Sequence, residues 1–264
     1  MILFAVSLAG VALFFWPFFA SAAPPQTFSF AVALGVVAAL AFIELATRRL
    51  DARRFALLAA IAALDAGLRL VLVVGIGGFS PIFFLILAAG YVYGPSFGFL
   101  CGATSLLASA VATGGIGPWL PYQLIACGWV GMAAGLAGTG RNGMPTKRDV
   151  AVLAAVGLIT GYVFGALLDV WDWTTFYRAA PSFGWLPGLS IGDALARFGR
   201  FYVATSAVYD TFRAAGNVIV IAVLGAPVLA AFARLRARMH VTWLSPLAPP
   251  AHTLQETSPA PRRL

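Results

Sequence analysis

Long apolar runs separated by short polar gaps make up most of the chain. They lack the alternation of polar and apolar positions over about ten residues that marks the strands of a membrane barrel. Runs of this kind are typical of helices that cross a bilayer, because a helix satisfies its backbone hydrogen bonds internally. The pattern predicts eight apolar segments, at residues 3–22, 28–46, 55–75, 80–93, 96–113, 119–137, 150–170 and 203–233.

The composition agrees with this pattern. Hydrophobic residues make up 61% of the chain and charged residues 10%, whereas a soluble domain has about half apolar and about a quarter charged residues. We therefore predict an all-α integral membrane protein in a lipid bilayer. The net charge of +8 could suit nucleic acid, but the basic residues form short clusters between apolar runs, so no nucleic-acid partner is expected.

The basic clusters predict an orientation. They lie between segments two and three, between segments six and seven, and after segment eight, and comprise Arg48, Arg49, Arg53, Arg54, Arg141, Lys147, Arg148, Arg234, Arg236, Arg238, Arg262 and Arg263. By the positive-inside rule the side that carries them is the cytoplasm. We expect a multi-pass protein of the cell membrane with both termini in the cytoplasm.

The chain divides into three predicted parts. Residues 1–50 hold two N-terminal transmembrane helices, residues 51–238 a six-helix substrate-binding membrane core, and residues 239–264 a Pro-rich cytoplasmic tail that we expect to be disordered. The stretch FASAAPP around residues 20–23 resembles a signal-peptidase site. No Lys or Arg precedes the apolar run, which favours an uncleaved helix.

Two connections on the outer side are expected to close over a binding site, one at residues 75–81 and one at about residues 171–200. The second is long and rich in aromatic residues, Pro and Gly. Long connections between compact segments are often functional lids or disordered linkers. The aromatic residues favour an ordered lid.

Motifs for enzymatic chemistry are absent from the sequence. A phosphate-binding loop needs a lysine in a glycine-rich context, and the single lysine, Lys147, is not in one. Zinc-protease, hydrolase and Cys/His metal motifs are also absent. Cys101 and Cys127 both lie in apolar segments, where we expect them to pack. We therefore expect a protein that binds or moves a substrate, with no enzymatic activity, cofactor or bound metal.

Pairs of ionisable residues interrupt two apolar segments. A charge at mid-bilayer costs about 2.5–3.5 kcal/mol on insertion scales, so each needs a partner or a function. Asp65 and Arg69 are four positions apart, and Asp210 and Arg213 are three apart. Both spacings allow side chains to pair along one helix.

One face of the last segment carries four polar residues: Ser206, Asp210, Arg213 and Asn217. They lie level with polar and aromatic residues of other segments, near the outer surface. These groups either pair and lock the bundle or line a ligand pocket open to the outside, and we expect the pocket because aromatic and polar residues cluster there. The candidate substrate-binding residues are Arg69, Trp119, Gln123, Asp169, Trp171, Asp210, Arg213 and Asn217.

The third segment also carries a face of small residues, which we call the small-residue face: Ala56, Ala60, Ala63 and Gly67. It lies roughly opposite Asp65 and Arg69. Small residues at four-residue spacing let helix backbones approach closely. The face serves either packing within the bundle or docking of a partner membrane protein. The glycine pairs 98/102, 131/135 and 161/165 repeat this spacing.

An ordered series of motifs resembles a known family. FSPIFF, GYVYGPSFGF and TGGIGPWLPYQ, followed near the end by YDTFRAAGNVIVIAVLGAPVL, are similar to the substrate-binding S components of energy-coupling factor (ECF) vitamin transporters of the actinobacterial type. The resemblance covers about residues 55–235.

The resemblance implies a six-helix core that binds a water-soluble vitamin or related micronutrient from outside, with a cobalamin-like corrinoid as first candidate and riboflavin or another vitamin open. It implies partners as well: an ECF transmembrane coupling subunit that carries two ATPases. Docking in the family uses an Ala-x-x-x-Ala pattern in the first core helix, for which Ala56/Ala60 and Ala59/Ala63 are candidates here.

Two alternatives stay open. The first is a membrane enzyme acting on a lipid or polyprenyl substrate, with a divalent metal held by the DVWD stretch of Asp169 and Asp172. The second is a secondary transporter that works alone, although no inverted repeat is visible.

Overall fold

A computed structural model describes residues 2–22, 24–47, 51–71, 82–139, 143–178 and 180–239. These residues are almost entirely helical, with one isolated bridge between Arg178 and Trp185. The elements are α1 (Ile2–Phe15), the 3-10 helix η1 (Trp16–Phe18), α2 (Gln26–Ala46), α3 (Ala52–Val71), α4 (Ile82–Tyr93), α5 (Pro95–Thr113), α6 (Leu120–Gly138), α7 (Lys147–Thr175), α8 (Ile191–Thr205) and α9 (Ala207–Met239).

Five of these helices, α2, α5, α6, α7 and α9, are long and apolar enough to cross a membrane. Large apolar side chains such as Phe42, Ile159 and Val223 are exposed on them, as expected of a surface that lipid covers. The described residues thus agree with an all-α, multi-pass membrane protein. α1 and α4 are shorter, with 14 and 12 residues, so the count of eight spans stays a prediction.

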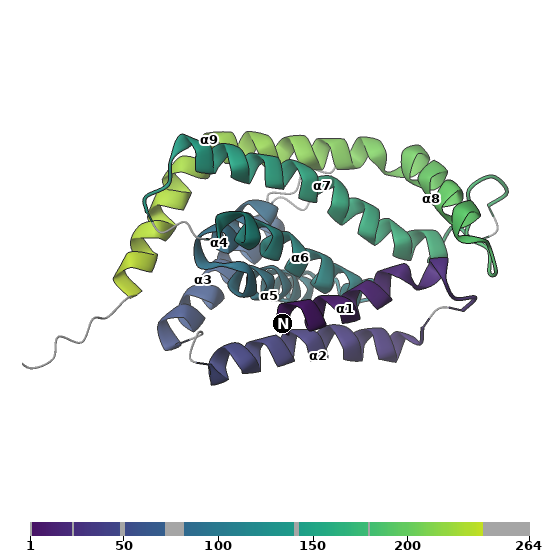
Figure 1. The fold of residues 1–264 in the computed structure, drawn as a ribbon, viewed down its shortest axis with the longest axis horizontal. Helices are drawn as coiled ribbons and strands as arrows, with labels where there is room; N and C mark the ends of the chain where they lie inside the picture. The colour runs from purple at the N-terminus through teal and green to yellow at the C-terminus, as the bar shows by residue number, and fades with distance from the viewer. Residues whose placement is uncertain are drawn as a thin grey trace, which may run out of the picture.

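The helices form layers around α4, α5 and α6 (Figure 1). α3 packs beside α5 and α4. α7 and α9 run side by side and cover one side of the centre, while α1 and α2 lie on the opposite side against α6. The N-terminal pair therefore contacts the predicted core directly.

Glycines bring the backbones of α4, α5 and α6 into contact. A Cβ placed on Gly98 would lie 2.2 Å from the carbonyl oxygen of Gly131, and one on Gly102 would lie 2.1 Å from that of Cys127. In the α7–α9 pair, a Cβ on Gly161 would lie 2.8 Å from the Cα of Ala214. The small-residue spacings thus mark true close helix contacts. Cys101 and Cys127 are free and buried, as expected for packing.

The region of α7 and α8 differs from the prediction. α7 starts at a capping box in which Thr146 and Asp149 satisfy each other's backbone N–H groups, and it continues past residue 170, so Trp171 lies in a helix and not in a connection. α8 was not predicted. The Ser190 hydroxyl caps it by accepting from the N–H of Asp193.

The last predicted segment is two helices and not one. α8 ends at Thr205 and α9 starts at Ala207, so Ser206 stands at the break and not on the face of α9. The Thr205 hydroxyl donates to the carbonyl of Phe201 and lies 3.0 Å from the Ser206 hydroxyl, local bonds that compete with a continuous helix. α9 bends toward its C-terminus (Figure 1), and Pro227 within it lacks a backbone donor.

A second buried cluster joins η1 to α7, α8 and the connection between them, and we call it the aromatic cluster: Phe18, Trp173, Trp185, Ala194 and Phe201. The indole N–H of Trp185 donates to the carbonyl of Pro17 at 3.1 Å. The aromatic residues between α7 and α8 thus pack in an ordered arrangement over η1. The predicted lid at residues 75–81 and the tail from residue 240 lie outside the described residues.

Candidate functional site

Three pockets adjoin one another at the end of the bundle where α8 lies. The first, which we call the arginine pocket, has a volume of about 170 Å³ and is lined by Arg69, Phe83, Leu106, Gln123, Cys127, Phe164, Leu168, Tyr209 and Arg213. The second, the tryptophan pocket, has about 270 Å³ and is lined by Trp119, Tyr122, Gln123, Leu168, Trp171 and Asp172. Because Gln123 and Leu168 line both, the two pockets share a wall.

The third pocket, the Arg178 pocket, continues this series. It has about 190 Å³ and is lined by Trp16, Pro24, Gln26, Ser29, Pro118, Tyr122, Trp171, Thr174, Thr175 and Arg178. Tyr122 and Trp171 also line the tryptophan pocket, so the three pockets follow one another. Sequence reasoning missed most of this third lining, and four of its ten residues come from the N-terminal part that the resemblance does not cover.

Arg69 enters the arginine pocket from the last turn of α3. Its Nη1 donates to the hydroxyl of Ser109 at 2.7 Å, and not to Asp65 as the i,i+4 spacing predicted. The carboxylate of Asp65 is fully buried, and neither oxygen has a hydrogen-bond partner among the described residues. The expected pair is wrong because Asp65 points into the packed centre of the bundle while the longer Arg69 side chain reaches α5.

Arg213 enters the same pocket from α9. It pairs with Asp210, as the i,i+3 spacing predicted. Its guanidinium carbon lies 5.4 Å from the ring centre of Phe164 and 5.0 Å from that of Tyr209, so both rings contact the cation. Asp210 thereby holds one edge of the guanidinium in place.

Asp210 is buried behind Arg213 and does not line the pocket. Besides Arg213, it accepts a hydrogen bond from the hydroxyl of Tyr202 in α8 at 2.9 Å. Burial and this hydrogen bond raise the pKa of the Tyr202 phenol above its usual value of 10.0, so the phenol keeps its proton and donates it at neutral pH. Sequence reasoning missed Tyr202, because it belongs to the helix that was not predicted.

Two further predicted residues lie away from the three pockets. The amide of Asn217 is buried and donates to the carbonyl of Gly157 at 2.9 Å, so it links α9 to α7. Asp169 is buried in α7, and its Oδ2 has no hydrogen-bond partner among the described residues. The structure therefore brings Arg69, Gln123 and Arg213 together and leaves Asp169 and Asn217 outside this lining.

The tryptophan pocket brings together the two predicted stacking residues. The ring centres of Trp119 and Trp171 lie 5.8 Å apart with their planes at 71°, the edge-to-face arrangement that aromatic pairs prefer. Trp119 stands just before α6 and Trp171 near the end of α7. Flat apolar surface next to a polar pocket suits a ligand with a ring and a polar group.

Among the described residues, the small-residue face of α3 is largely open. Ala56, Ala60 and Ala63 are exposed, and nothing lies within 4 Å of a Cβ placed on Gly67. This excludes the interpretation that the face packs within the described part of the bundle.

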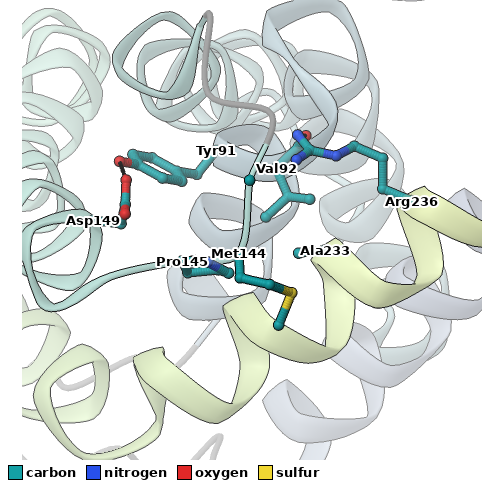
Figure 2. A pocket seen from close by; sticks show the side chains of 8 residues that line it. Tyr91, Val92, Met144, Pro145, Asp149, Ala233 and Arg236 are labelled. Carbon is teal, nitrogen blue, oxygen red and sulfur yellow. Dashed lines mark hydrogen bonds between the residues drawn. The ribbon is translucent and has the colours of Figure 1, made fainter.

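A further pocket, of about 230 Å³, lies at the opposite end, between α4, the start of α7 and the end of α9 (Figure 2). The hydroxyl of Tyr91 donates to Asp149 at 2.7 Å, and Arg236 donates to the carbonyl of Val92 at 2.9 Å. These bonds tie the three helices together. No predicted site residue lines this pocket.

Within the described residues, no group of three or more His, Cys, Asp or Glu side chains is placed to hold a metal ion. No family model, curated protein or solved structure matches the chain.

Proposed function

We propose that the protein is the substrate-binding S component of an ECF-type importer, which takes a water-soluble vitamin or related micronutrient from outside the cell. The observation that carries the proposal is the convergence of Arg69, Gln123 and Arg213 on one pocket with Trp119 and Trp171 beside it. Four helices, α3, α6, α7 and α9, carry or adjoin these groups at one end of an apolar bundle. Such a site is suited to a polar solute, and a transporter needs a solute site that opens toward one side of the membrane.

The volumes of the three pockets indicate how large a ligand they can hold. Each is below the roughly 300–1,000 Å³ typical of pockets for drug-sized ligands, and adjoining pockets can hold different parts of one molecule. The volumes favour a vitamin smaller than the corrinoid that the resemblance implies first. A corrinoid would require the three pockets to widen and merge.

The small-residue face of α3 supports the partner that we propose. An exposed strip of Ala and Gly on a membrane helix allows a helix of another protein to approach closely. We assign this face to docking of the ECF transmembrane coupling subunit, which carries the two ATPases. The energy for uptake then comes from these partners.

The direct test is to purify the chain in detergent and identify co-purifying small molecules by native mass spectrometry. We expect a vitamin or related micronutrient at one molecule per chain. If no such compound co-purifies and none of a vitamin panel binds, the proposal is wrong.

Docking can be tested separately by co-purification with a coupling subunit and its ATPases. Replacing Ala60 by Leu adds bulk to the small-residue face, so we expect loss of the complex with ligand binding retained. The matched control is Ala39→Leu, which adds the same bulk to an exposed position of α2. Equal recovery of the complex with both variants would exclude docking through α3.

A further inference from the structure

The arginine pocket has an unusual charge balance for the inside of a membrane bundle. Two of its lining residues are arginines, and none is acidic. Asp210 neutralises Arg213 from behind, and Asp65 is fully buried outside the lining. Arg69 therefore faces the pocket with Ser109 as its hydrogen-bond acceptor. Cationic groups in this setting are costly and mark a functional site by default.

Both guanidinium groups keep donors for a ligand. A guanidinium has five N–H donors in a planar fork. Among the described residues, the hydrogen bonds of Arg69 and of Arg213 use Nη1 alone. Nε and Nη2 of each group thus have no protein acceptor there. Two arginine forks at one pocket are suited to hold a group with two equivalent anionic oxygens.

We propose that the ligand of this site is an organic acid, whose carboxylate binds Arg69 and Arg213 in the arginine pocket. This inference rests on the proposed function and adds the substrate class to it. The remainder of the ligand extends past Gln123 into the tryptophan pocket, where Trp119 and Trp171 contact its ring or apolar part. The two arginines disfavour a cationic vitamin, and an uncharged vitamin would leave their donors without acceptors.

Matched ligand pairs that differ only in the acid group test the inference. The probes are nicotinate and nicotinamide, pantothenate and pantothenol, and biotin and biotinamide, with thiamine as a cation. Binding to the full chain in detergent is measured by thermal shift and by calorimetry. We expect one acid to bind. Its amide or alcohol partner should bind with an affinity lower by on the order of 10–100-fold, because it lacks the group that makes charge-assisted hydrogen bonds.

Substitutions of the two arginines test whether the acid group binds in the arginine pocket. Arg69→Gln is expected to weaken binding of the acid by about 10–100-fold with little effect on the neutral partner. Arg213→Gln alone would leave Asp210 buried without its cation, so the double variant Arg213→Gln/Asp210→Asn keeps the region neutral and should weaken the acid to a similar extent. The control is Arg200→Gln, because Arg200 is an exposed residue of α8. This variant should bind the acid with the same affinity as the unchanged protein.

The outcomes separate this inference from the proposed function. Tight binding of a neutral or cationic vitamin would overturn the organic-acid inference but not the S-component proposal. Equal binding of an acid to the Arg69→Gln and Arg200→Gln variants would have the same consequence. Displacement of the acid by phosphatidylglycerol in mixed detergent micelles would assign the arginines to a lipid headgroup and overturn the organic-acid inference too. Binding of no member of this panel overturns the organic-acid inference, whereas the S-component proposal is overturned only if, in addition, no vitamin or related micronutrient co-purifies with the chain.

Discussion

At the scale of single residues, the polar groups at the start of α9 have separate roles. Arg213 faces a pocket, Asp210 holds it from behind, and Asn217 joins two helices. The spacing of Asp210 and Arg213 predicted their pairing, because both lie in one helix. The contacts of Asp210 with Tyr202 and of Asn217 with Gly157 could not be predicted, because they depend on which helices are neighbours.

Tyr202 provides a test of how Asp210 is held. Tyr202→Phe removes the hydrogen bond to a buried carboxylate, so we expect a loss of about 1.5–3 kcal/mol in the free energy of unfolding, measured by thermal denaturation in detergent. The control is Tyr162→Phe, which removes an exposed, neutral hydrogen bond to Thr211 and should cost about 0.5–1.5 kcal/mol. Equal losses would show that Asp210 does not depend on Tyr202.

Gly165 leaves room for the Asp210 carboxylate. A Cβ on Gly165 would lie 1.8 Å from Oδ2 of Asp210, so Gly165→Ala must displace the ion pair and should destabilise the fold by about 1–3 kcal/mol. Gly199→Ala is the control, because nothing lies within 4 Å of its Cβ; in a helix this change should stabilise by about 0.5–1 kcal/mol. A thermal midpoint of the Gly165 variant at or above that of the unchanged protein would contradict the geometry.

At the scale of elements, the sequence predicts most helices from their apolar length, and it also contained a signal for the one that we missed. Ser190 and Asp193 have the spacing of a helix start, and Ala194, Phe198 and Phe201 follow at helical intervals. The Gly, Pro and aromatic residues before them favoured a connection instead. The docking of η1 under this region had no local signal, since its contacts are far apart in the chain.

The aromatic cluster predicts that η1 contributes to stability. Phe18 is 7% exposed and its ring contacts those of Trp173 and Phe198. Phe18→Ala should therefore cost about 3–5 kcal/mol, measured as the change in thermal unfolding in detergent. Its neighbour Phe19 is 75% exposed, so Phe19→Ala should change stability little. Similar effects of the two variants would mean that η1 does not pack as described.

At the scale of the whole molecule, the sequence predicts an all-α membrane protein and an orientation, because apolar length and basic charge are properties of segments. It cannot predict which side chains meet. Arg69 and Arg213 come from α3 and α9, and only the packing of α3 against α5 and of α9 against α7 places them at one pocket.

The orientation can be tested with single cysteines and an impermeant thiol reagent on intact cells. Phe176, just after α7, and Met144, just before it, are both exposed and lie at opposite ends of the bundle. We expect Phe176→Cys to react from outside, and Met144→Cys to react only after permeabilisation. The buried Cys101 and Cys127 should give little background. The reverse pattern would place the α8 end in the cytoplasm.

The glycine contacts have a mechanical consequence. The backbones touch where Gly98 meets Gly131, and at most the methyl group of Ala214 lies at the contact with Gly161. Neither the α4–α6 group nor the α7–α9 pair can therefore slide internally without breaking its contacts. We expect each to move as a rigid body. The arginine pocket draws its lining from both bodies, so a small hinge motion between them would change its volume while both stay folded.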